Sequence, residues 1–294
     1  MIAYVARAFC HDSLGGNPAG VVIVDRELSL TSAQMQVIAK KLNFSETAFI
    51  SYTESHSYKA LYFTPTSQID FCGHATLAAF GVLKQLGSLK NSVYPLETQA
   101  GKCEVVLRDH LIFLSQPLPV FGENIEKTEI TPILGDVISA SEPSPRIVST
   151  GLRDIFVRVQ DEKCLQSLKP NFGLMSELNK RTHSIGIHVF SLDRPGSQAI
   201  AHCRNFAPLY GIDEESATGS SNGALACYLF EREMLPLASE HWLLFRQGEN
   251  LNAPSDIYVH LRTHERTIGR VECGGEVVVD EARELNVPSD IQSS

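Results

Sequence analysis

The sequence predicts an α+β fold of two similar domains, each with a barrel-like antiparallel sheet around one apolar helix. Three observations support this prediction. The chain has 294 residues, of which 43% are hydrophobic, and this is enough for two cores. Short apolar runs with β-branched and aromatic residues alternate with turn residues, which is typical of strands. Motifs in the second half of the chain also repeat the order of motifs in the first half.

The repeat is clearest around two glycines that are 146 residues apart, Gly73 and Gly219. Each begins an uncharged segment with helical composition, and each follows a Phe-x-Pro motif, Phe63-Thr64-Pro65 in one half and Phe206-Ala207-Pro208 in the other. Two prolines near residue 118 mark a boundary. We therefore expect domains at 1–118 and 119–278, related by a pseudo-twofold axis, and a tail at 279–294 that packs back on the first domain.

Composition and charge exclude several classes of protein. The net charge is −9, without a basic run, which argues against a nucleic-acid partner or an anionic membrane surface. The seven cysteines are scattered and form no Cys-x-x-Cys pair, so we expect reduced thiols and neither a disulfide framework nor a zinc site. No segment approaches membrane-spanning length. We expect a cytoplasmic protein with a small-molecule ligand and no metal or cofactor.

The predicted elements follow from periodicity and capping. Thr31 and Gln34 form a capping-box pattern that begins an amphipathic helix ending at Asn43. A glycine-rich loop is expected at 14–20. Further helices are expected at 73–86, 132–134 and 170–180 and from Gly219 onward, and strands at 2–9, 21–24, 43–50, 58–63, 69–71, 96–100, 103–107, 110–114, 155–159, 185–191, 199–206 and 277–279.

Cys72-Gly73-His74 is the first candidate site, because it lies where a strand gives way to an apolar helix. The first turn of a helix has unpaired N–H groups that suit a carboxylate or phosphate. The thiol of Cys72 and the imidazole of His74 are possible acid/base groups, and the helix dipole is expected to lower the thiol pKa. The alternative is a core helix capped by a satisfied histidine, and the local sequence leaves both readings open.

Glu46 is the second candidate. If 43–50 is a strand, alternation places Glu46 on the same face as Phe44, Ala48 and Ile50. A carboxylate buried on an apolar face would favour its neutral form and suit proton transfer near neutral pH. The alternative is a glutamate at a strand end that reaches solvent.

Taken together, the motifs resemble the PhzF-like (phenazine-biosynthesis-type) isomerase family. The matching blocks run in order over nearly the whole chain: Phe9, Gly16-Asn17-Pro18-Ala19, Asn43-Phe44-Ser45-Glu46-Thr47-Ala48-Phe49, Phe63-Thr64-Pro65, Phe71-Cys72-Gly73-His74-Ala75-Thr76, Ala217-Thr218-Gly219-Ser220, Gln247-Gly248 and Pro254-Ser255.

The resemblance implies the two-domain fold of diaminopimelate epimerase and proline racemase, a homodimer, and chemistry without metal or organic cofactor. It implies catalytic roles for Glu46 and His74. Ligand contacts are implied for Gly73, Gly219 and Ser220. The chain departs from the family pattern at Tyr62 and Gln68, where Arg and Glu are common, and at Glu215 and Ser216, where Asp and Pro are common.

The expected activity is therefore an isomerase that moves a proton along a small unsaturated carboxylate. Glu46 would act as general base, with His74 and Glu215 orienting the ligand or shuttling protons. The ligand would lie between the two helix N-termini, close to the remaining residues of the matching motifs, Asn17, Cys72, Ser216 and Thr218. Two alternatives remain: a racemase, epimerase or dehydratase that uses Cys72 and Ser216, and a non-catalytic binding protein with the same fold.

Overall fold

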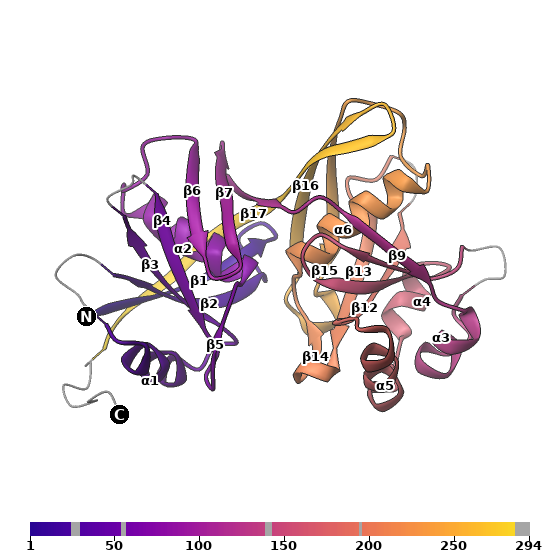
Figure 1. Cartoon of the computed structure of the whole chain (residues 1–294), viewed down its shortest axis with the longest axis horizontal. Helices are drawn as coiled ribbons and strands as arrows, with labels where there is room; N and C mark the ends of the chain where they lie inside the picture. Colours follow the sequence, from indigo (N-terminus) through magenta and orange to yellow (C-terminus); the bar gives the residue numbers. More distant parts are fainter. Residues whose placement is uncertain (25–29, 54–56, 139–142, 194–195, 286–294) are drawn as a thin grey trace. The chain divides into compact units, whose positions relative to one another are not determined.

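The computed structural model describes residues 1–24, 30–53, 57–138, 143–193 and 196–285. These residues form two compact units, shown in Figure 1. Unit 1 comprises Met1–Ser115 together with the segment from Gly274 onward, and unit 2 comprises Gln116–Cys273.

Unit 1 is built from nine strands and two helices within the described residues. The strands are β1 (Ile2–Cys10), β2 (Asn17–Ile23), β3 (Thr47–Tyr52), β4 (Tyr58–Phe63), β5 (Gln68–Ile69), β6 (Val93–Thr98), β7 (Gly101–Arg108), β8 (Leu111–Gln116) and the C-terminal part of β17 (Thr267–Glu284). The helices are α1 (Ser32–Leu42) and α2 (Gly73–Gln85).

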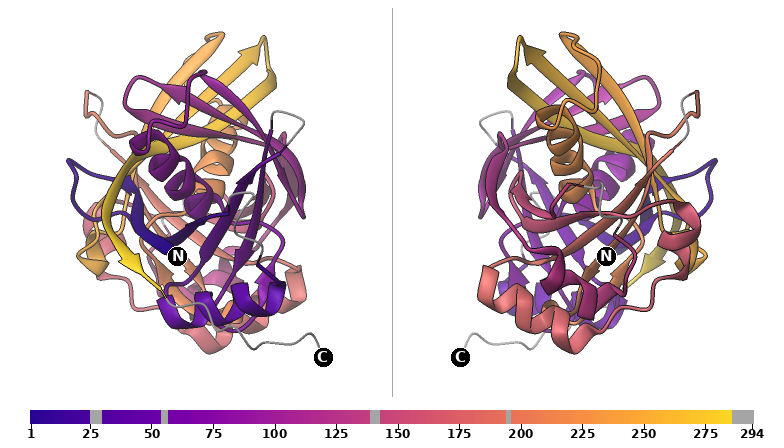
Figure 2. Two further views of the ribbon diagram at one scale, coloured as in Figure 1. Left: turned by 90° about the vertical axis from the view of Figure 1, so that its left-hand side faces the viewer. Right: turned by 90° about the vertical axis from the view of Figure 1, so that its right-hand side faces the viewer.

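The strands of unit 1 close into a barrel. The order around the ring is β1, β2, β3, β4, β6, β7, β8 and β17, and β17 then pairs with β1. The pairs β1–β2, β3–β4, β6–β7, β7–β8 and β17–β1 are antiparallel. The pairs β2–β3 and β4–β6 are parallel because α1 and α2 cross between them. Figure 2 (left) shows yellow β17 beside indigo β1.

Helix α2 occupies the core of this barrel. Residues 74–83 of α2 are all buried, because its surface is apolar nearly all round. The helix packs on β1, β2 and β3, and Phe80 meets Tyr58 of β4 and Tyr94 of β6. On the side of α2 that faces β17, Gly81 contacts Val277. The predicted barrel-like sheet around one apolar helix is therefore present in unit 1.

Unit 2 repeats this order of pairings. Its elements are β9 (Val120–Asn124), α3 (Lys127–Leu134), β10 (Arg146–Ser149), β11 (Arg153–Arg158), α4 (Glu162–Ser167), α5 (Phe172–Thr182), β12 (Gly186–Leu192), β13 (Ala201–Ala207), η1 (Pro208–Tyr210), β14 (Ile212–Glu215), α6 (Gly219–Glu231), β15 (Glu240–Gln247), η2 (Glu249–Leu251), β16 (Ser255–His264) and the N-terminal part of β17.

In unit 2 as in unit 1, a parallel pair encloses each helical crossover. Strand β11 is parallel to β12 across α4 and α5, and β13 is parallel to β15 across α6, whereas β12 with β13 and β15 with β16 are antiparallel. Helices α2 and α6 have the same length, 13 residues. The predicted helix starts at Gly73 and Gly219 are thus correct, and the pseudo-twofold relation between the units stays a prediction.

Several boundaries differ from the sequence expectations. Strand β2 begins at Asn17, inside the expected glycine-rich loop, because residues 17–22 pair with β1. Strand β3 begins at Thr47, because Asn43 ends α1 in the left-handed conformation and the chain must turn before extending. Glu46 therefore lies in the turn before β3, and the face assigned to it by strand alternation is wrong. The capping box at Thr31 and Gln34 is confirmed.

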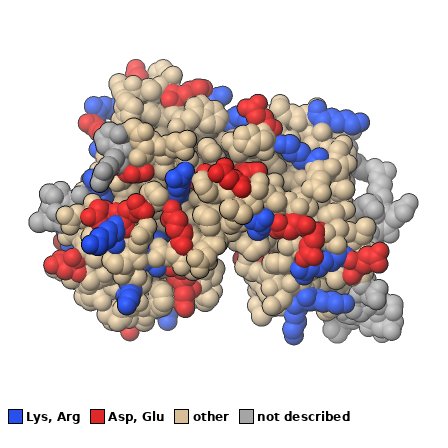
Figure 3. Space-filling view, turned by 180° about the vertical axis from the view of Figure 1, so that it is seen from behind, with Lys and Arg blue, Asp and Glu red and all other residues tan. Residues whose placement is uncertain are grey.

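Charged residues of both signs are interspersed over the surface of each unit on the face shown in Figure 3. Among the described residues, no helix is long and apolar enough to cross a membrane.

Candidate active site

In unit 1, Glu46, Cys72 and His74 lie together at the N-terminal end of α2. Cys72 is the N-cap residue of this helix, and His74 is its second residue. Glu46 comes from the turn before β3. The Oε2 atom of Glu46 lies 3.2 Å from Nε2 of His74, with 14% and 7% of the two side chains exposed. The Sγ atom of Cys72 lies 3.5 Å from Nδ1 and 3.9 Å from Nε2 of the same imidazole.

The imidazole of His74 has a third neighbour, Asn17, which begins β2 and is buried. The Nδ2 atom of Asn17 lies 3.3 Å from Nδ1 of His74. Since Asn17 belongs to a different strand, three separate segments of unit 1 meet at one imidazole. The structure thus brings together four of the residues that the sequence analysis singled out.

Electrostatics at this site differ from the sequence expectation. Burial would raise the pKa of Glu46, but the hydrogen bond and charge of His74, together with hydrogen bonds from Ser45 and Cys72, outweigh it, and the pKa is lowered. Burial would lower the pKa of His74, but Cys72 and Glu46 raise it well above its ordinary value. The pair is therefore a carboxylate beside an imidazolium near neutral pH. The expectation of a neutral Glu46 is wrong because its closest neighbour is a cation.

The thiol of Cys72 also differs from expectation. Burial raises its pKa, and although His74 opposes this effect, it does not reverse it. The helix N-terminus does not produce a thiolate here. Cys72 is thus better described as a buried thiol beside the pair than as a second base.

A short hydrogen-bond chain fixes the start of α2. The hydroxyl of Tyr62 on β4 lies 2.6 Å from Oγ1 of Thr76, and Thr76 in turn donates to the carbonyl of Cys72 at 2.7 Å. Because the one hydroxyl proton of Thr76 is used in that bond, Tyr62 is the donor. Tyr62 is one of the departures from the family pattern, and sequence reasoning had given it no role.

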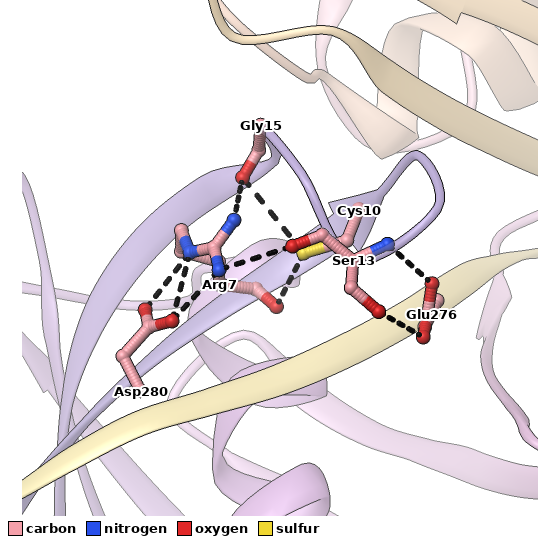
Figure 4. Close-up of polar contacts among 6 residues, drawn as sticks. All are labelled: Arg7, Cys10, Ser13, Gly15, Glu276 and Asp280. Carbon is pink, nitrogen blue, oxygen red and sulfur yellow. Dashed lines mark hydrogen bonds and ion pairs between the residues drawn. The ribbon is translucent and has the colours of Figure 1, made fainter.

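A second network fixes the loop between β1 and Asn17, as Figure 4 shows. The guanidinium of Arg7 on β1 makes three hydrogen bonds to Asp280 of β17, at 2.7, 2.8 and 3.1 Å. It also donates to the carbonyl of Gly15 at 2.6 Å. Ser13 donates to Glu276 at 3.3 Å. The C-terminal strand thereby holds the loop that leads into Asn17.

In unit 2, the start of α6 is held by Gln247, a fully buried residue at the end of β15. Its Oε1 accepts from the Thr218 N–H at 3.2 Å and from Asn222 at 2.9 Å. Its Nε2 donates to the carbonyl of Glu215 at 2.8 Å. The Glu215 carboxylate in turn accepts from the Thr218 hydroxyl at 2.6 Å. Gln247 was part of the family resemblance, but its positioning role could not be read from the sequence.

The other site residues predicted in unit 2 also lie at the start of α6. Ser216 is in the link between β14 and α6, and Gly219 and Ser220 begin α6. The carbonyls of Gly219 and Ser220 accept from Gln116 at 3.1 Å and from Thr150 at 3.0 Å. As first-turn residues, Gly219 and Ser220 leave their N–H groups without intrahelical acceptors, as Gly73 does in unit 1.

Two buried titratable groups lie beneath α6, and the sequence analysis had named neither. Asp154 on β11 accepts from the hydroxyl of Ser221 at 2.5 Å, and burial raises its pKa to about 6. His188 on β12 contacts Asn205 at 3.0 Å, and burial lowers its pKa to about 4. His188 lies inside the predicted strand 185–191, whereas Asp154 lies one residue before the predicted strand 155–159, so the sequence could have indicated burial for His188 alone and a partner for neither.

Comparison with solved structures shows which proteins share this fold. The chain superposes on a hydroxyproline epimerase from Agrobacterium vitis with a TM-score of 0.63 over 96% of this chain and 91% of that one, at 12% identity, which shows a shared fold. A PhzF-family phenazine biosynthesis protein from Bacillus anthracis has a TM-score of 0.87 at 25% identity, covering 98% and 99% of the two chains.

The family follows from the sequence comparisons. A profile of the phenazine biosynthesis-like (PhzC-PhzF) family matches residues 6–283. The chain is 33% identical to an uncharacterized isomerase of Clostridium acetobutylicum over 288 residues, which cover 94% of this chain and 95% of that one. This chain belongs to the PhzC-PhzF family.

Proposed function

We propose that the chain is a cofactor-independent isomerase that moves a proton along a small unsaturated carboxylate, with Glu46 as general base. The observation that carries the proposal is the buried pair of Glu46 and His74, with 3.2 Å between Oε2 and Nε2. Family membership and relatives named as isomerases support the reaction class. The pair supplies what such a reaction needs, a carboxylate and a proton donor side by side.

The state of the pair suits proton abstraction. The lowered pKa of Glu46 means that it is ionised and can accept a proton at neutral pH. Its Oε2 atom lies 3.2 Å from Nε2 of His74, and because a carboxylate oxygen has two lone pairs, one can face His74 while the other accepts the substrate proton. In the proposed reaction, Glu46 removes a proton from a carbon activated by conjugation, and the electron pair of that C–H bond enters the conjugated system. Glu46 then returns the proton to another carbon on the same face.

The helix starts are proposed to hold the substrate carboxylate. First-turn N–H groups stabilise an anion and any negative charge that develops in the transition state. A Cβ atom placed on Gly73 would lie 3.9 Å from the nearest protein atom, Cδ2 of Leu114. Protein packing therefore does not require a glycine at this position, and close approach of a ligand is a reason for one. That one ligand uses both helix starts stays a prediction, as does the orienting role of Glu215.

The two alternatives remain outcomes of the test. A racemase, epimerase or dehydratase would need Cys72 as a base, and the raised pKa of the buried thiol works against this. A non-catalytic binding protein would bind a carboxylate without proton exchange.

The test is proton exchange in D₂O, followed by ¹H NMR on a panel of small unsaturated carboxylates, with their saturated analogues as controls. We expect at least one unsaturated acid to lose a proton at one carbon, to gain deuterium at another, and to shift its double bond. Exchange confined to the stereocentre of a saturated acid would favour the racemase reading. Binding without exchange in any compound would contradict an enzymatic role.

A further inference from the structure

We propose that Thr76 of α2 and Asn222 of α6 are positioning residues of the proposed reaction. Each orients and polarises one peptide group at the start of its own helix, and the N–H of that peptide, on Gly73 in unit 1 and on Gly219 in unit 2, binds the substrate carboxylate. The inference rests on the proposed function of the helix starts. It adds the residues that set the direction and the strength of these donors.

In α2, the carbonyl of the N-cap residue Cys72 accepts two hydrogen bonds from Thr76. The backbone N–H of Thr76 donates to it at 3.1 Å, as in any helix, and the Thr76 hydroxyl donates to it at 2.7 Å. This carbonyl belongs to the same peptide group as the N–H of Gly73. Because both lone pairs of the carbonyl oxygen are used, the plane of the peptide is fixed, and with it the direction of the Gly73 N–H.

Helix α6 has the same arrangement with a different side chain. The carbonyl of its N-cap residue Thr218 accepts from the backbone N–H of Asn222 at 3.1 Å and from the side-chain Nδ2 at 3.0 Å. This carbonyl shares its peptide group with the N–H of Gly219. The spacing of 146 residues that separates Gly73 from Gly219 also separates Thr76 from Asn222. Both halves of the chain thus use the same position of the helix for the same acceptor.

A second buried residue supports each of these side chains. The Tyr62 hydroxyl donates to Oγ1 of Thr76 at 2.6 Å, so the bond to the Cys72 carbonyl is the second in a chain. Hydrogen bonds in a chain polarise one another, and a polarised carbonyl makes the N–H of its peptide a stronger donor. In α6, Oε1 of Gln247 accepts the other amide proton of Asn222 at 2.9 Å. This contact keeps the first proton directed at the Thr218 carbonyl.

Packing alone does not account for polar side chains at these two positions. Thr76 and Asn222 are fully buried. The helix positions that follow them, 77–83 and 223–230, are all hydrophobic or glycine, and both Thr and Asn favour a helix less than Ala or Leu does. An action on the peptide N–H accounts for both residues. Donors held in place in advance are also what stabilises negative charge as it develops in a transition state.

The test observes Gly73 and Gly219 directly, by ¹⁵N–¹H NMR of the full chain labelled at glycine and titrated with crotonate, a small unsaturated carboxylate. We expect crotonate to shift both amide resonances in the wild type. Thr76→Val removes the hydroxyl. It should move the free Gly73 ¹⁵N resonance upfield and weaken crotonate binding at Gly73 by about 5-fold, the net contribution of one hydrogen bond. Thr76→Ser keeps a hydroxyl and should restore both.

Asn222 offers a matched pair of variants on α6. Asn222→Thr supplies the hydroxyl that α2 uses and should keep most of the crotonate affinity at Gly219, whereas Asn222→Val should lower it by about 5-fold. Thr182→Val is the control, because the buried Thr182 hydroxyl donates to the Leu178 carbonyl at 2.9 Å within α5, away from either helix start. This variant should lose stability and change neither glycine resonance nor crotonate affinity.

Deuterium exchange into the substrate found in the carboxylate panel is the second readout. Thr76→Val should slow it by more than about 5-fold, and by less than the roughly 100-fold that removal of a whole donor costs. Thr76→Ser should restore the rate. If Thr76→Val does not fold, Tyr62→Phe combined with Thr76→Val, which leaves no unpaired hydroxyl, takes its place.

The outcomes separate this inference from the proposed function. The inference is overturned if Thr76→Val leaves the Gly73 resonance in place, or if crotonate shifts neither glycine in the wild type. A moved resonance with unchanged crotonate affinity and unchanged exchange would also overturn it, and would make Thr76 a structural residue only. Weaker crotonate binding in Thr76→Val, together with no exchange in the wild-type chain, would keep the inference and refute the isomerase.

Discussion

At the scale of single residues, the ionisation of Glu46 depends on His74. A buried carboxylate alone favours its neutral form, and a buried imidazole alone favours its neutral form, but 3.2 Å apart each stabilises the charge of the other. The sequence could indicate both residues as candidates. It could not show that they meet, because 28 positions separate them and their contact depends on the turn before β3 lying against the start of α2.

Asp154 and His188 provide a pH prediction. The native state holds the Asp154 proton up to pH about 6, above the ordinary range of an aspartate, so stability should fall as pH rises from about 4 to about 6. The two-unit shift corresponds to roughly 3 kcal/mol. His188 acts oppositely, since its lowered pKa makes stability fall as pH drops from about 6.5 towards 4.

The two effects offset each other in the pH dependence of wild-type stability. The measurement is therefore the difference in the free energy of unfolding between wild type and variant at each pH. Urea unfolding of wild type and Asp154→Asn from pH 4 to pH 7 should show the variant gaining relative stability as pH rises. Asp213→Asn, at an exposed position of β14, is the control and should show a flat difference. A flat difference for Asp154→Asn would contradict its raised pKa.

At the scale of elements, α2 is the best-predicted part of the chain. Its start, its apolar character and its burial all follow from residues 73–85 alone. In contrast, strands β9, β10, β15 and β16 and helix α4 were not predicted. They are short or carry many polar residues, and their formation depends on pairing partners distant in the chain, such as β15 with both β13 and β16.

Two glycines of α2 should respond differently to the same substitution. A Cβ on Gly81 would lie 2.2 Å from Cγ1 and 2.8 Å from Cβ of Val277, so Gly81→Ala should destabilise unit 1 by about 1–3 kcal/mol. A Cβ on Gly73 meets no protein atom closer than 3.9 Å, so Gly73→Ala should leave stability unchanged or slightly higher. It should instead lower the isomerase activity by about 10- to 200-fold, the range for one methylene in a binding pocket.

Thermal unfolding and deuterium exchange measure the two effects separately. Val277→Ala combined with Gly81→Ala should recover part of the lost stability, because the smaller side chain makes room for the new methyl group. Equal losses of stability in both single glycine variants would show that the start of α2 is as closely packed as its middle.

At the scale of the whole molecule, the two units differ in how the chain builds them. Unit 2 is one continuous segment with its own buried cluster, which includes Ile147, Met175 and Phe206. Unit 1 needs both ends of the chain, since β17 pairs with β1 and closes the barrel. The sequence predicted two domains and a returning C-terminal tail, but the extent of β17 follows only from its pairing. The homodimer stays a prediction.

This difference predicts the behaviour of fragments. Residues 116–273 should fold alone and unfold cooperatively on heating, because they form one continuous segment whose buried cluster is internal. Residues 1–115 should not, because β1 would lose the strand paired with residues 2–10 and the barrel would be open. Circular dichroism melting curves of the two fragments test this. A cooperative transition in 1–115 together with none in 116–273 would contradict the division.

The central claim is that Glu46, and not Cys72, carries the proton. Its most direct test compares Glu46→Gln with Cys72→Ala by the rate of deuterium exchange into the substrate identified in the carboxylate panel. We predict that exchange falls by roughly 100-fold or more in Glu46→Gln, the contribution of a positioned general base, and survives largely intact in Cys72→Ala. Loss of exchange in Cys72→Ala with near-normal exchange in Glu46→Gln would contradict the account and assign the chemistry to the thiol.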